Sequence, residues 1–442
     1  MEKQLKKLFG TDGIRGEANV WPMTPDVALA VGRALAFTLP AGARVLVAGD
    51  TRPSRGMLEC ALAAGLASGG ADALLAGTLP TPAVAVVLRA LHAHAGIAIT
   101  ASHNPASDNG IKIFNADGCK LDDEQEKILE GEAPTSRPSS QIGTVSRVEN
   151  AADLYVKHIL ASVKPGLLEG VPVVVDCANG AASEIAPKIF NALGARAEFI
   201  ACEPEGMNIN DNCGALHPEK LLARVRETQS KLGIALDGDA DRLVLCDAHG
   251  IADGDRLLAA AAASLDAQSR LAKRTVVVTS VANLGLHDAL AKRGIRVEVA
   301  DVGERYVIER MRAGGFNFGG ETSGHLVFGD HATSGDGILA ALQFASLMGG
   351  ATLSEWLSTS GMTPFPQCFE SFRVREKIPF EQLPLLQKTI RDAETNLGSD
   401  GRVMVRYSGT ENKIRVLVEA RTEDRATHWM AAFRAAIGTE LQ

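Results

Sequence analysis

Aromatic residues and paired cysteines are scarce in this 442-residue sequence. Phe, Trp and Tyr together make up 5% of the chain, so we expect a core of Ala, Val, Leu and Ile, as in sheets covered by helices. The seven cysteines are odd in number and form no CxxC pair, which argues against a disulfide framework or a zinc site. Cysteines of this kind favour a reducing cytoplasm.

The sequence also lacks a long apolar run. No stretch approaches the roughly 20 residues that a membrane-spanning helix needs, and residues 1–10 lack the apolar segment of a signal peptide. The net charge of −8 argues against nucleic-acid or anionic-membrane binding, because both need a positive surface. We therefore expect a cytoplasmic protein that binds neither, although Arg and Lys concentrated locally would still bind an anionic substrate.

Short apolar runs alternate with helical stretches through the first three quarters of the chain. Most runs are nearly continuous in Val, Ile, Leu and Ala, as strands buried on both faces should be. The alternation predicts an α/β fold with mixed, largely parallel sheets. Expected strands are Arg44–Gly49, Gly96–Thr100, Val171–Asp176, Gly233–Leu236, Thr275–Thr279 and Arg296–Ala300, and expected helices include Pro25–Leu39, Ser54–Ala67, Ala182–Leu193 and Pro218–Thr228.

Three breaks divide the sequence into four expected domains. Residues 131–144 are rich in Pro, Ser and Gly and predict a linker or long loop, and further breaks fall near residues 253–254 and at residues 361–366. The last part of the chain is expected to run strand, helix, strand, strand, helix. We predict three α/β domains over residues 1–150, 151–253 and 254–364, and a C-terminal α+β domain over residues 365–442.

A candidate catalytic loop follows the expected strand Gly96–Thr100. It places Ser102 beside His103 on a turn fixed by Pro105, so the hydroxyl is a candidate nucleophile. Lys112 follows shortly after and is a candidate for neutralising phosphate charge or for acid–base catalysis. The same residue types are common in simple capped turns. No GxSxG elbow surrounds Ser102, which disfavours a hydrolase-type serine.

An acidic loop lies between two apolar runs. Asp237, Asp239 and Asp241 stand at alternate positions, where three carboxylates repel one another unless a cation compensates them. Oxygen ligands without Cys or His favour Mg²⁺, Mn²⁺ or Ca²⁺ over zinc. An EF-hand is excluded because its sixth position would be Arg242 and its twelfth Ala248. The alternative is a solvated acidic turn.

A third loop gathers a carboxylate, a hydroxyl and an imidazole between glycines. Glu321, Ser323 and His325 are suited to a ligand rich in hydroxyl groups, because carboxylates accept and hydroxyl or imidazole groups donate hydrogen bonds. The alternative is a simple hairpin turn between Phe316–Phe318 and Leu326–Phe328.

A fourth loop combines hydroxyls and glycine with basic residues near the C-terminus. Arg406, Ser408, Gly409 and Thr410, followed by Arg415, are typical of a phosphate cradle, and the alternative is a basic hairpin tip. The chain has no Walker lysine motif, which excludes a P-loop nucleotide site.

Further candidate residues stand in less specific surroundings. Arg15 lies within the glycine-rich stretch Phe9–Gly16, and Arg52 follows another expected strand. Gly303 and Arg305 belong to a strand-to-helix turn upstream of the third loop. Alone, none of these positions predicts a function.

Taken together, the loops resemble those of the α-D-phosphohexomutase superfamily, in the same order and at the same intervals over essentially the whole chain. Its serine, metal, sugar and phosphate loops are matched by Thr100–Pro105, Asp237–Arg242, Gly320–His325 and Arg406–Glu411. The stretch Phe9–Gly16 is most similar to members that act on glucosamine phosphate. The resemblance implies an isomerase that moves a phosphoryl group between two hydroxyls of a sugar phosphate, with four domains in a heart-shaped arrangement around a central cleft.

The resemblance also implies a role for each candidate residue. Ser102 would be the phosphoserine and would hold one Mg²⁺ together with Asp237, Asp239 and Asp241. Lys112 and His325, with His103 behind them, would be the acid–base candidates, and Arg15 and Arg242 would stand near the transferring group. The substrate-binding residues would be Glu321, Ser323, Gly303, Arg305, Arg406, Ser408, Gly409, Thr410 and Arg415.

The implied reaction interconverts glucosamine 6-phosphate and glucosamine 1-phosphate through a sugar 1,6-bisphosphate, which is both intermediate and activator, and feeds synthesis of UDP-N-acetylglucosamine and cell-wall precursors. A homodimer and an activating kinase are compatible with it. Thr322, Tyr407 and Asn412 depart from the common pattern and bear on which sugar is used. The alternatives are a phosphoglucomutase/phosphomannomutase of the same superfamily, an aspartyl phosphatase using Asp237, and a non-catalytic sugar-phosphate binder.

Overall fold

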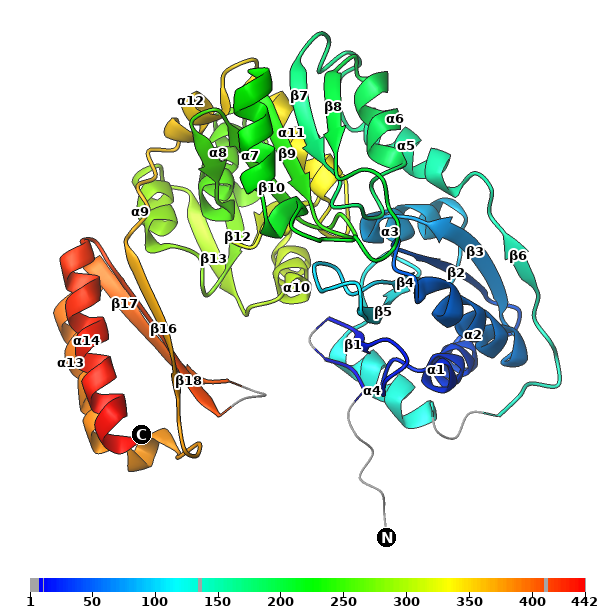
Figure 1. The fold of residues 1–442 in the computed structure, drawn as a ribbon, viewed down its shortest axis with the longest axis horizontal. Coiled ribbons are helices and arrows are strands. Elements are labelled where there is room, and N and C mark those ends of the chain that lie inside the picture. Colours follow the sequence, from blue (N-terminus) through cyan, green and yellow to red (C-terminus); the bar gives the residue numbers. More distant parts are fainter. Residues whose placement is uncertain (1–7, 11, 134–136, 409–411, 442) are drawn as a thin grey trace. The chain divides into compact units, whose positions relative to one another are not determined.

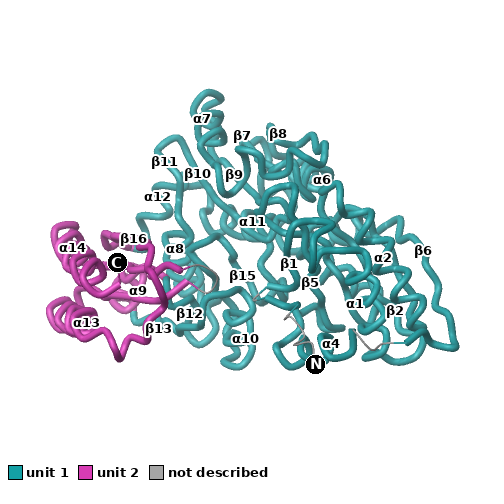
Figure 2. Tube along the Cα trace, turned by 60° about the horizontal axis from the view of Figure 1, so that its bottom comes forward, with its two compact units in different colours: residues 1–281, 294–360 teal, residues 282–293, 361–442 magenta. Residues whose placement is uncertain are grey.

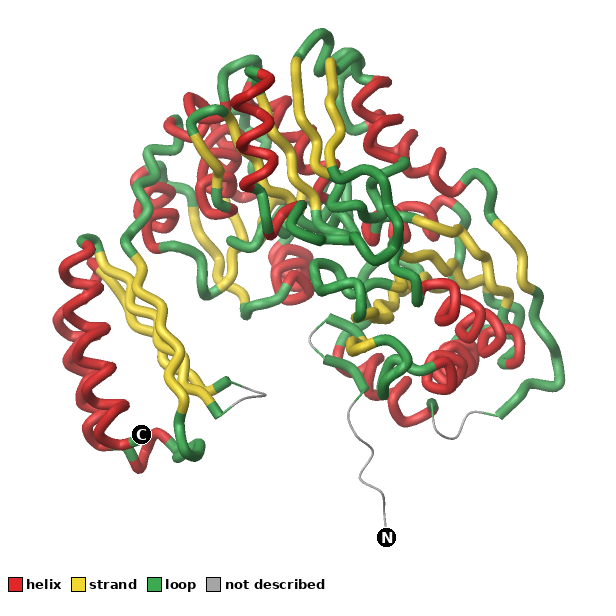
Figure 3. Tube along the Cα trace, viewed as in Figure 1, coloured by secondary structure: helices red, strands yellow, loops and turns green. Residues whose placement is uncertain are grey.

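The computed structural model describes residues 8–10, 12–133, 137–408 and 412–441 of the chain. The chain divides into two compact units (Figure 2): unit 1 comprises residues 1–281 and 294–360, and unit 2 comprises residues 282–293 and 361–442. Helices and strands alternate through most of unit 1 (Figure 3), as the pattern of apolar runs predicts.

A six-stranded mixed sheet forms the N-terminal part of unit 1 (Figure 1). It consists of β1 (Ile14–Glu17), β2 (Arg44–Gly49), β3 (Asp72–Thr78), β4 (Ala95–Ile99), β5 (Asp108–Asn115) and β6 (Val145–Arg147). The spatial order is β1-β5-β4-β2-β3-β6, with β5 antiparallel to its two neighbours and the other pairs parallel. Parallel β2 and β4 end at the same edge, so the residues after them, Asp50 and Thr100, meet in a 2.6 Å hydrogen bond.

Four helices accompany this sheet, and local sequence signals define where two of them begin. They are α1 (Pro25–Thr38), α2 (Arg55–Ser68), α3 (Thr81–Ala90) and α4 (Asp123–Glu132). Pro25 opens α1 behind the N-cap Thr24, because proline fixes a helical φ and needs no hydrogen-bond acceptor there. Asp122 and Gln125 form a capping box at the start of α4. Helices α1 and α2 share a buried apolar core with β2, β4 and β5.

The second sheet has five strands and contains the acidic loop in one of its turns. Its strands are β7 (Pro172–Asp176), β8 (Arg196–Ile200), β9 (Leu232–Leu236), β10 (Leu243–Asp247) and β11 (Gly250–Ala252), in the order β11-β10-β9-β7-β8. Strands β7, β8 and β9 are parallel, whereas β10 is antiparallel to β9 and β11. The helices of this region are α5 (Ala151–Ala161), α6 (Ile185–Ala192) and α7 (Glu219–Thr228).

The third sheet has four strands in the order β13-β12-β14-β15. They are β12 (Thr275–Thr279), β13 (Arg296–Ala300), β14 (Phe318–Gly320) and β15 (Leu326–Phe328), and the antiparallel pair β14–β15 encloses residues 321–325. The unit 1 helices that follow the second sheet in the chain are α8 (Gly254–Ala267), α10 (Glu304–Gly314), α11 (Gly337–Met348) and α12 (Leu353–Ser358).

Unit 2 contains an antiparallel three-stranded sheet with two long helices on one face (Figure 1). Leu386, Val416 and Phe433 are fully buried between the sheet and the helices. The elements of unit 2 are α9 (Leu284–Lys292), β16 (Gln367–Arg373), α13 (Pro384–Leu397), β17 (Gly401–Tyr407), β18 (Lys413–Ala420) and α14 (Glu423–Glu440).

The structure confirms the predicted fold class, an α/β protein with mixed sheets and a C-terminal α+β part. Three of the six predicted strands, β2, β12 and β13, have the predicted bounds. The other three, β4, β7 and β9, differ by one residue, which is within the usual uncertainty of element boundaries. The expected helix Ala182–Leu193 is shorter, because residues 180–184 form turns before α6 begins. Short 3₁₀ turns span Gly214–Leu216, Ala272–Arg274, Phe380–Gln382 and Gly398–Asp400. Among the described residues, no helix is both long and apolar enough to cross a membrane.

Candidate active site

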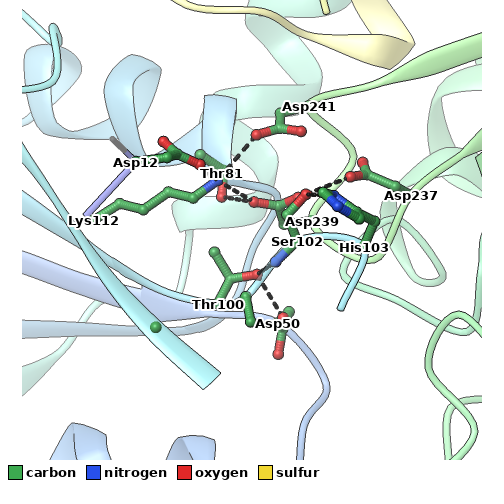
Figure 4. A network of polar contacts seen from close by, with 12 residues as sticks. Asp12, Asp50, Thr81, Thr100, Ser102, His103, Lys112, Asp237, Asp239 and Asp241 are labelled. Carbon is green, nitrogen blue, oxygen red and sulfur yellow. Dashed lines mark hydrogen bonds and ion pairs between the residues drawn. The ribbon is translucent and has the colours of Figure 1, made fainter. Parts of the chain in front are cut away.

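Ser102 lies just beyond the end of β4 and faces the acidic turn between β9 and β10 (Figure 4). Its Oγ donates a hydrogen bond to Oδ2 of Asp237 at 2.7 Å, across a sequence separation of 135 residues. Nδ1 of His103 lies 3.2 Å from Oγ of Ser102. The serine is buried, and its backbone has a positive φ of 54°. The structure therefore brings the hydroxyl and the acidic turn into direct contact.

Gly238 allows the serine loop and the acidic turn to touch through their backbones. A Cβ atom at this position would lie 2.8 Å from the carbonyl oxygen of Ser102 and 2.8 Å from Nδ2 of Asn210. Both distances are shorter than a side-chain carbon tolerates, so any larger residue would push the two loops apart. The glycine between the first two aspartates is thus required by the close approach of Ser102.

The three aspartates of the acidic turn are buried, and their carboxylates lie close together. Asp237, Asp239 and Asp241 each contribute one carboxylate oxygen to a group whose members lie within 4.8 Å of one another. The pairing of Leu236 with Leu243 in β9 and β10 closes the turn that carries them. Burial raises the pKa of Asp237 well above its ordinary value, and the charges of Asp241 and Asp239 raise it further.

Lys112 on β5 is the counter-ion of this carboxylate group (Figure 4). Its buried Nζ lies 2.9 Å from Oδ2 of Asp239, 3.0 Å from Oδ2 of Asp241 and 3.4 Å from Oδ2 of Asp12. Burial alone would lower the pKa of Lys112, but these three carboxylates outweigh it and hold the pKa well above its ordinary value. The lysine therefore carries its proton at neutral pH. The Thr81 hydroxyl also donates to Asp239, at 2.6 Å.

The acidic turn fits a hard divalent cation. Oδ1 of Asp239 and Oδ1 of Asp241 are buried without a hydrogen-bond partner, although buried oxygens of this kind are normally satisfied. All the ligand atoms are oxygens, which favours Mg²⁺ and related ions. Glu304, whose carboxylate approaches Asp241 and His325, instead accepts from Nζ of Lys120 at 2.5 Å, and this ammonium disfavours a second cation there.

His103 is held in its neutral form beside the serine. Burial, followed by the positive charges of Arg242 and Arg15, lowers the pKa of His103 to about 4. At pH 7 its imidazole is therefore neutral. The guanidinium of Arg15 pairs with Asp12 and lies 3.5 Å from the carbonyl oxygen of Ala101, directly before the serine.

Arg242 and His325 form the next part of the site. Nε of Arg242 donates to Nε2 of His325 at 3.0 Å, and the backbone N–H of Arg242 donates to Asp237 at 3.2 Å. Because arginine can only donate, Nε2 of His325 must be an acceptor. The neutral imidazole consequently carries its hydrogen on Nδ1, which lies 3.5 Å from Oδ1 of Asp241. Arg242 thus fixes the tautomer of His325.

A cavity of about 710 Å³ opens beside these residues within unit 1. Glu321, Ser323 and His325, from the turn between β14 and β15, line it together with Arg15 and His103. Its size is that of a small-molecule site. Gly303 also lines the cavity, and its backbone N–H donates to Oε1 of Glu321 at 3.0 Å, while Oγ of Ser323 lies 3.5 Å from Oε2 of the same side chain.

Ion pairs that were not predicted from the sequence build one wall of this cavity. Nζ of Lys120 bridges Oδ1 of Asp12 at 2.6 Å and Oε2 of Glu304 at 2.5 Å. Arg305 lines the cavity, but its guanidinium pairs with Asp123 and lies 3.3 Å from Glu126. Lys120 lies in no motif, and Glu304 stands between Gly303 and Arg305 in a turn that alone predicts no function. Only their meeting in the fold therefore reveals this pair.

The remaining predicted residues lie in unit 2. Arg406 at the end of β17 pairs in register with Arg415 on β18, and the backbone N–H of Ser408 donates to the carbonyl of Lys413 at 2.8 Å. Arg406 is exposed and Ser408 is buried. Gly409 and Thr410 lie outside the described residues. The structure thus gathers two arginines and a serine amide at one end of a β-hairpin.

Sequence comparisons match all four domains of one family. Phosphoglucomutase/phosphomannomutase domains I, II and III, each described as alpha/beta/alpha, match residues 6–138, 153–250 and 253–361, and the C-terminal domain of that family matches residues 371–436. The phosphoglucosamine mutase of Anaeromyxobacter dehalogenans (strain 2CP-C) is 48% identical over 442 aligned residues, which cover 95% of this chain and 96% of that protein.

Solved structures show the same architecture. A phosphoglucomutase/phosphomannomutase family protein from Burkholderia thailandensis superposes with a TM-score of 0.83 at 25% identity, covering 98% of this chain and 97% of that one. The N-acetylphosphoglucosamine mutase of Aspergillus fumigatus, solved in complex with GlcNAc-6P and magnesium, has a TM-score of 0.61 at 18% identity, covering 97% and 95% of the two chains.

Proposed function

We propose that this chain, which belongs to the phosphoglucosamine mutase family, interconverts glucosamine 6-phosphate and glucosamine 1-phosphate through phosphorylated Ser102. The observation that carries this proposal is the 2.7 Å contact between the Ser102 hydroxyl and Asp237 of the buried acidic turn. A nucleophile beside a site for a divalent cation is what phosphoryl transfer requires, because that reaction depends on positioning and charge stabilisation. The family assignment supports the sugar, and the geometry supports the nucleophile.

The proposed reaction has two transfers. In the first, the bond between phosphorus and Ser102 Oγ breaks, and the phosphoryl group joins O1 of glucosamine 6-phosphate, whose hydroxyl loses its proton. The resulting 1,6-bisphosphate turns end over end within the site. In the second, the phosphoryl group on O6 returns to Ser102 Oγ and glucosamine 1-phosphate leaves. A sugar 1,6-bisphosphate or an activating kinase would place the first phosphoryl group on Ser102.

The acidic turn is assigned to a magnesium ion. Asp237, Asp239 and Asp241, together with phosphorylated Ser102, would hold it, and the two unpartnered carboxylate oxygens described above support this assignment. When bound, the ion polarises the transferring phosphoryl group and offsets its developing charge. Removal of divalent cations should therefore abolish turnover, and added Mg²⁺ should restore it.

Charged and acid–base groups around Ser102 are assigned from their protonation. Lys112, held protonated by its carboxylates, supplies positive charge near the reacting group and can donate a proton. His103, neutral at pH 7 and with Nδ1 3.2 Å from Ser102 Oγ, is assigned as a further acid–base candidate beside the serine. His325, with its Nε2 facing Arg242, is assigned to proton transfer with the sugar hydroxyl once that arginine turns to the phosphoryl group.

Substrate binding is divided between two sets of residues. Gly303, Glu321 and Ser323 line the cavity and are assigned to the sugar hydroxyls, and Arg305 and Arg15 lie in the same wall. Arg406, Ser408, Gly409, Thr410 and Arg415 are assigned to the phosphate that is not reacting. Four domains with boundaries near residues 150, 253 and 364 would then each supply one loop.

Two assays test this proposal together. Ser102→Ala should abolish turnover while the protein stays folded, because no other hydroxyl replaces Oγ beside Asp237. Turnover of glucosamine, glucose and mannose 6-phosphates by the unaltered protein should be highest for glucosamine 6-phosphate. Substantial activity of the alanine variant would reject the nucleophile, and a preference for glucose or mannose phosphate would reject the sugar.

A further inference from the structure

The backbone of the candidate nucleophile adopts a conformation that is unfavourable for serine. Ser102 has a φ of 54°, in the left-handed region that side chains with a Cβ disfavour. Its N–H donates to Oγ1 of Thr100 at 2.9 Å, and the Thr100 hydroxyl donates to Oδ2 of Asp50 at 2.6 Å. The surroundings must therefore supply further contacts that hold this residue in place.

Arg52 supplies such contacts from the loop between β2 and α2. Its side chain is wholly buried, and its Nε donates to Oδ2 of Asp50 at 3.0 Å. One terminal nitrogen donates to the carbonyl oxygens of Ser102 at 2.9 Å and Asn104 at 2.8 Å, and the other donates to the carbonyl of Asp108 at 3.0 Å. Arg52, Asp50, Thr100 and Ser102 thus form a closed ring of hydrogen bonds.

Asn210 reaches the same two carbonyls from the second sheet. It lies in the loop after β8, and its Nδ2 donates to the carbonyl oxygens of Ser102 at 2.9 Å and Asn104 at 3.3 Å. Its own φ of 58° is left-handed, which asparagine tolerates better than most residues. Arg52, after β2 of the first sheet, and Asn210, after β8 of the second sheet, therefore donate to the same two carbonyl oxygens. These belong to Ser102 and Asn104.

We propose that Arg52 and Asn210 are positioning residues that hold the Ser102 backbone left-handed, so that Oγ faces the acidic turn. Neither side chain touches the reacting oxygen, and both contact the carbonyl of the residue that carries it. Burying a guanidinium is costly unless its donors are satisfied, and Arg52 meets this requirement largely with carbonyls of the serine loop. The inference rests on the proposed function, because it assumes that Ser102 is the nucleophile.

Two pairs of variants test the proposal with matched controls. Arg52→Lys keeps the charge but loses the fork of donors, and Asn210→Gly keeps a residue that tolerates a left-handed backbone but removes Nδ2. The control for Asn210 is Asn212→Gly, because Asn212 is also left-handed, at 51°, and its Nδ2 donates to Asp211. The control for Arg52 is Arg55→Lys, because Arg55 pairs with Glu59 at its own helix.

The expected result separates positioning from binding. Misplacing a reacting group by about 1 Å can cost on the order of 100-fold, so kcat of Arg52→Lys and Asn210→Gly should fall by about that factor. KM should change by less than about threefold, since the substrate contacts remain. The ³¹P resonance of phosphorylated Ser102 should shift in both variants, and both controls should keep the values of the unaltered protein.

The proposal is overturned if kcat of Asn210→Gly stays near that of Asn212→Gly, or if only KM changes. Asn210→Gly decides the matter where Arg52→Lys fails to fold, as judged by its thermal melt. Ser102→Ala, assayed in parallel, distinguishes a failure of the proposed function from a failure of the positioning inference. If it is active, the proposed function fails; if it is inactive while Asn210→Gly is fully active, only the positioning inference fails.

Discussion

At the scale of single residues, the site depends on a balance of buried charge. Asp12, Asp239 and Asp241 surround Nζ of Lys112, and each carboxylate would repel the others without that ammonium. The same balance leaves Oδ1 of Asp239 and Oδ1 of Asp241 without a hydrogen-bond partner. A divalent cation bound to those oxygens would also offset the negative charge of the carboxylates. Lysine and metal ion are therefore expected to stabilise the folded protein in partly redundant ways.

Lys112→Met tests this redundancy. Breaking a buried ion pair typically costs about 3–5 kcal/mol, so the metal-free variant should melt well below the unaltered protein. Saturating Mg²⁺ should recover part of that loss, because the cation compensates the buried carboxylates that have lost the lysine ammonium. Lys188→Met is the control, since Lys188 is half exposed and its ion pair with Asp153 is long, at 3.9 Å. Equal losses of melting temperature with and without Mg²⁺ would contradict the redundancy.

Gly238→Ala tests the contact between the two loops. The added Cβ would meet the Ser102 carbonyl oxygen at 2.8 Å, so the serine loop must move away from Asp237. We expect a loss in kcat on the order of 100-fold, as for other small displacements of a reacting group. Steady-state kinetics with glucosamine 6-phosphate would measure it. Gly250→Ala is the control, because a Cβ there meets nothing within 4 Å, and equal kcat values for the two variants would refute the close-approach argument.

At the scale of elements, α11 is joined to α5 through one buried carboxylate. Asp336 caps the N-terminus of α11 by accepting from the N–H of Leu339 at 2.9 Å, and its two oxygens accept from the Tyr155 hydroxyl at 3.0 and 2.9 Å. Burial raises the pKa of Asp336 to about 6, although these hydrogen bonds lower it. The carboxyl group of Asp336 therefore titrates near pH 6 in the folded protein.

The raised pKa predicts how Asp336 contributes to stability at different pH values. Between its unfolded value near 3.8 and its folded value near 6, the folded protein binds the extra proton, so this contribution is present at low pH and is lost as pH rises. Asp336→Asn keeps the cap without the charge. From pH 4 to pH 7, the variant should gain about 3 kcal/mol in unfolding free energy relative to the unaltered protein, from about two pKa units. Parallel pH profiles of the melting temperature would disprove this assignment.

At the scale of the whole molecule, much of the fold follows from patterns in the sequence. Short apolar runs predict β2, β7 and β12 because buried parallel strands need apolar residues on both faces. Polar residues that follow such strands, such as Ser102 and Asp237, could be selected as candidates for the same reason. The three sheets of unit 1 are mixed, as predicted, because hairpins add antiparallel strands to them.

Other parts of the site could not be predicted because they arise from contacts between distant segments. Lys120 and Glu304 are 184 residues apart. Lys120 belongs to no motif, and the turn that holds Glu304 predicts no function alone. Asn210 reaches the serine loop from a separation of 108 residues. Periodicity and turn chemistry describe local structure only, whereas these contacts depend on how the first sheet packs against the second and third. A sequence therefore reveals residues with distinctive neighbours and misses those whose partners come from elsewhere.

The most direct test of the account is to locate the phosphoryl group on the protein. Purified protein, incubated with glucosamine 1,6-bisphosphate and Mg²⁺, should carry one phosphate, and peptide mass analysis should place it on Ser102. The 1-deoxy analogue of glucosamine 6-phosphate, which lacks the O1 hydroxyl, should leave the phosphate on the protein. Glucosamine 6-phosphate itself should remove it as the bisphosphate forms. A phosphate on an aspartate of the acidic turn, or a protein that turns over without becoming phosphorylated, would contradict the central role of Ser102.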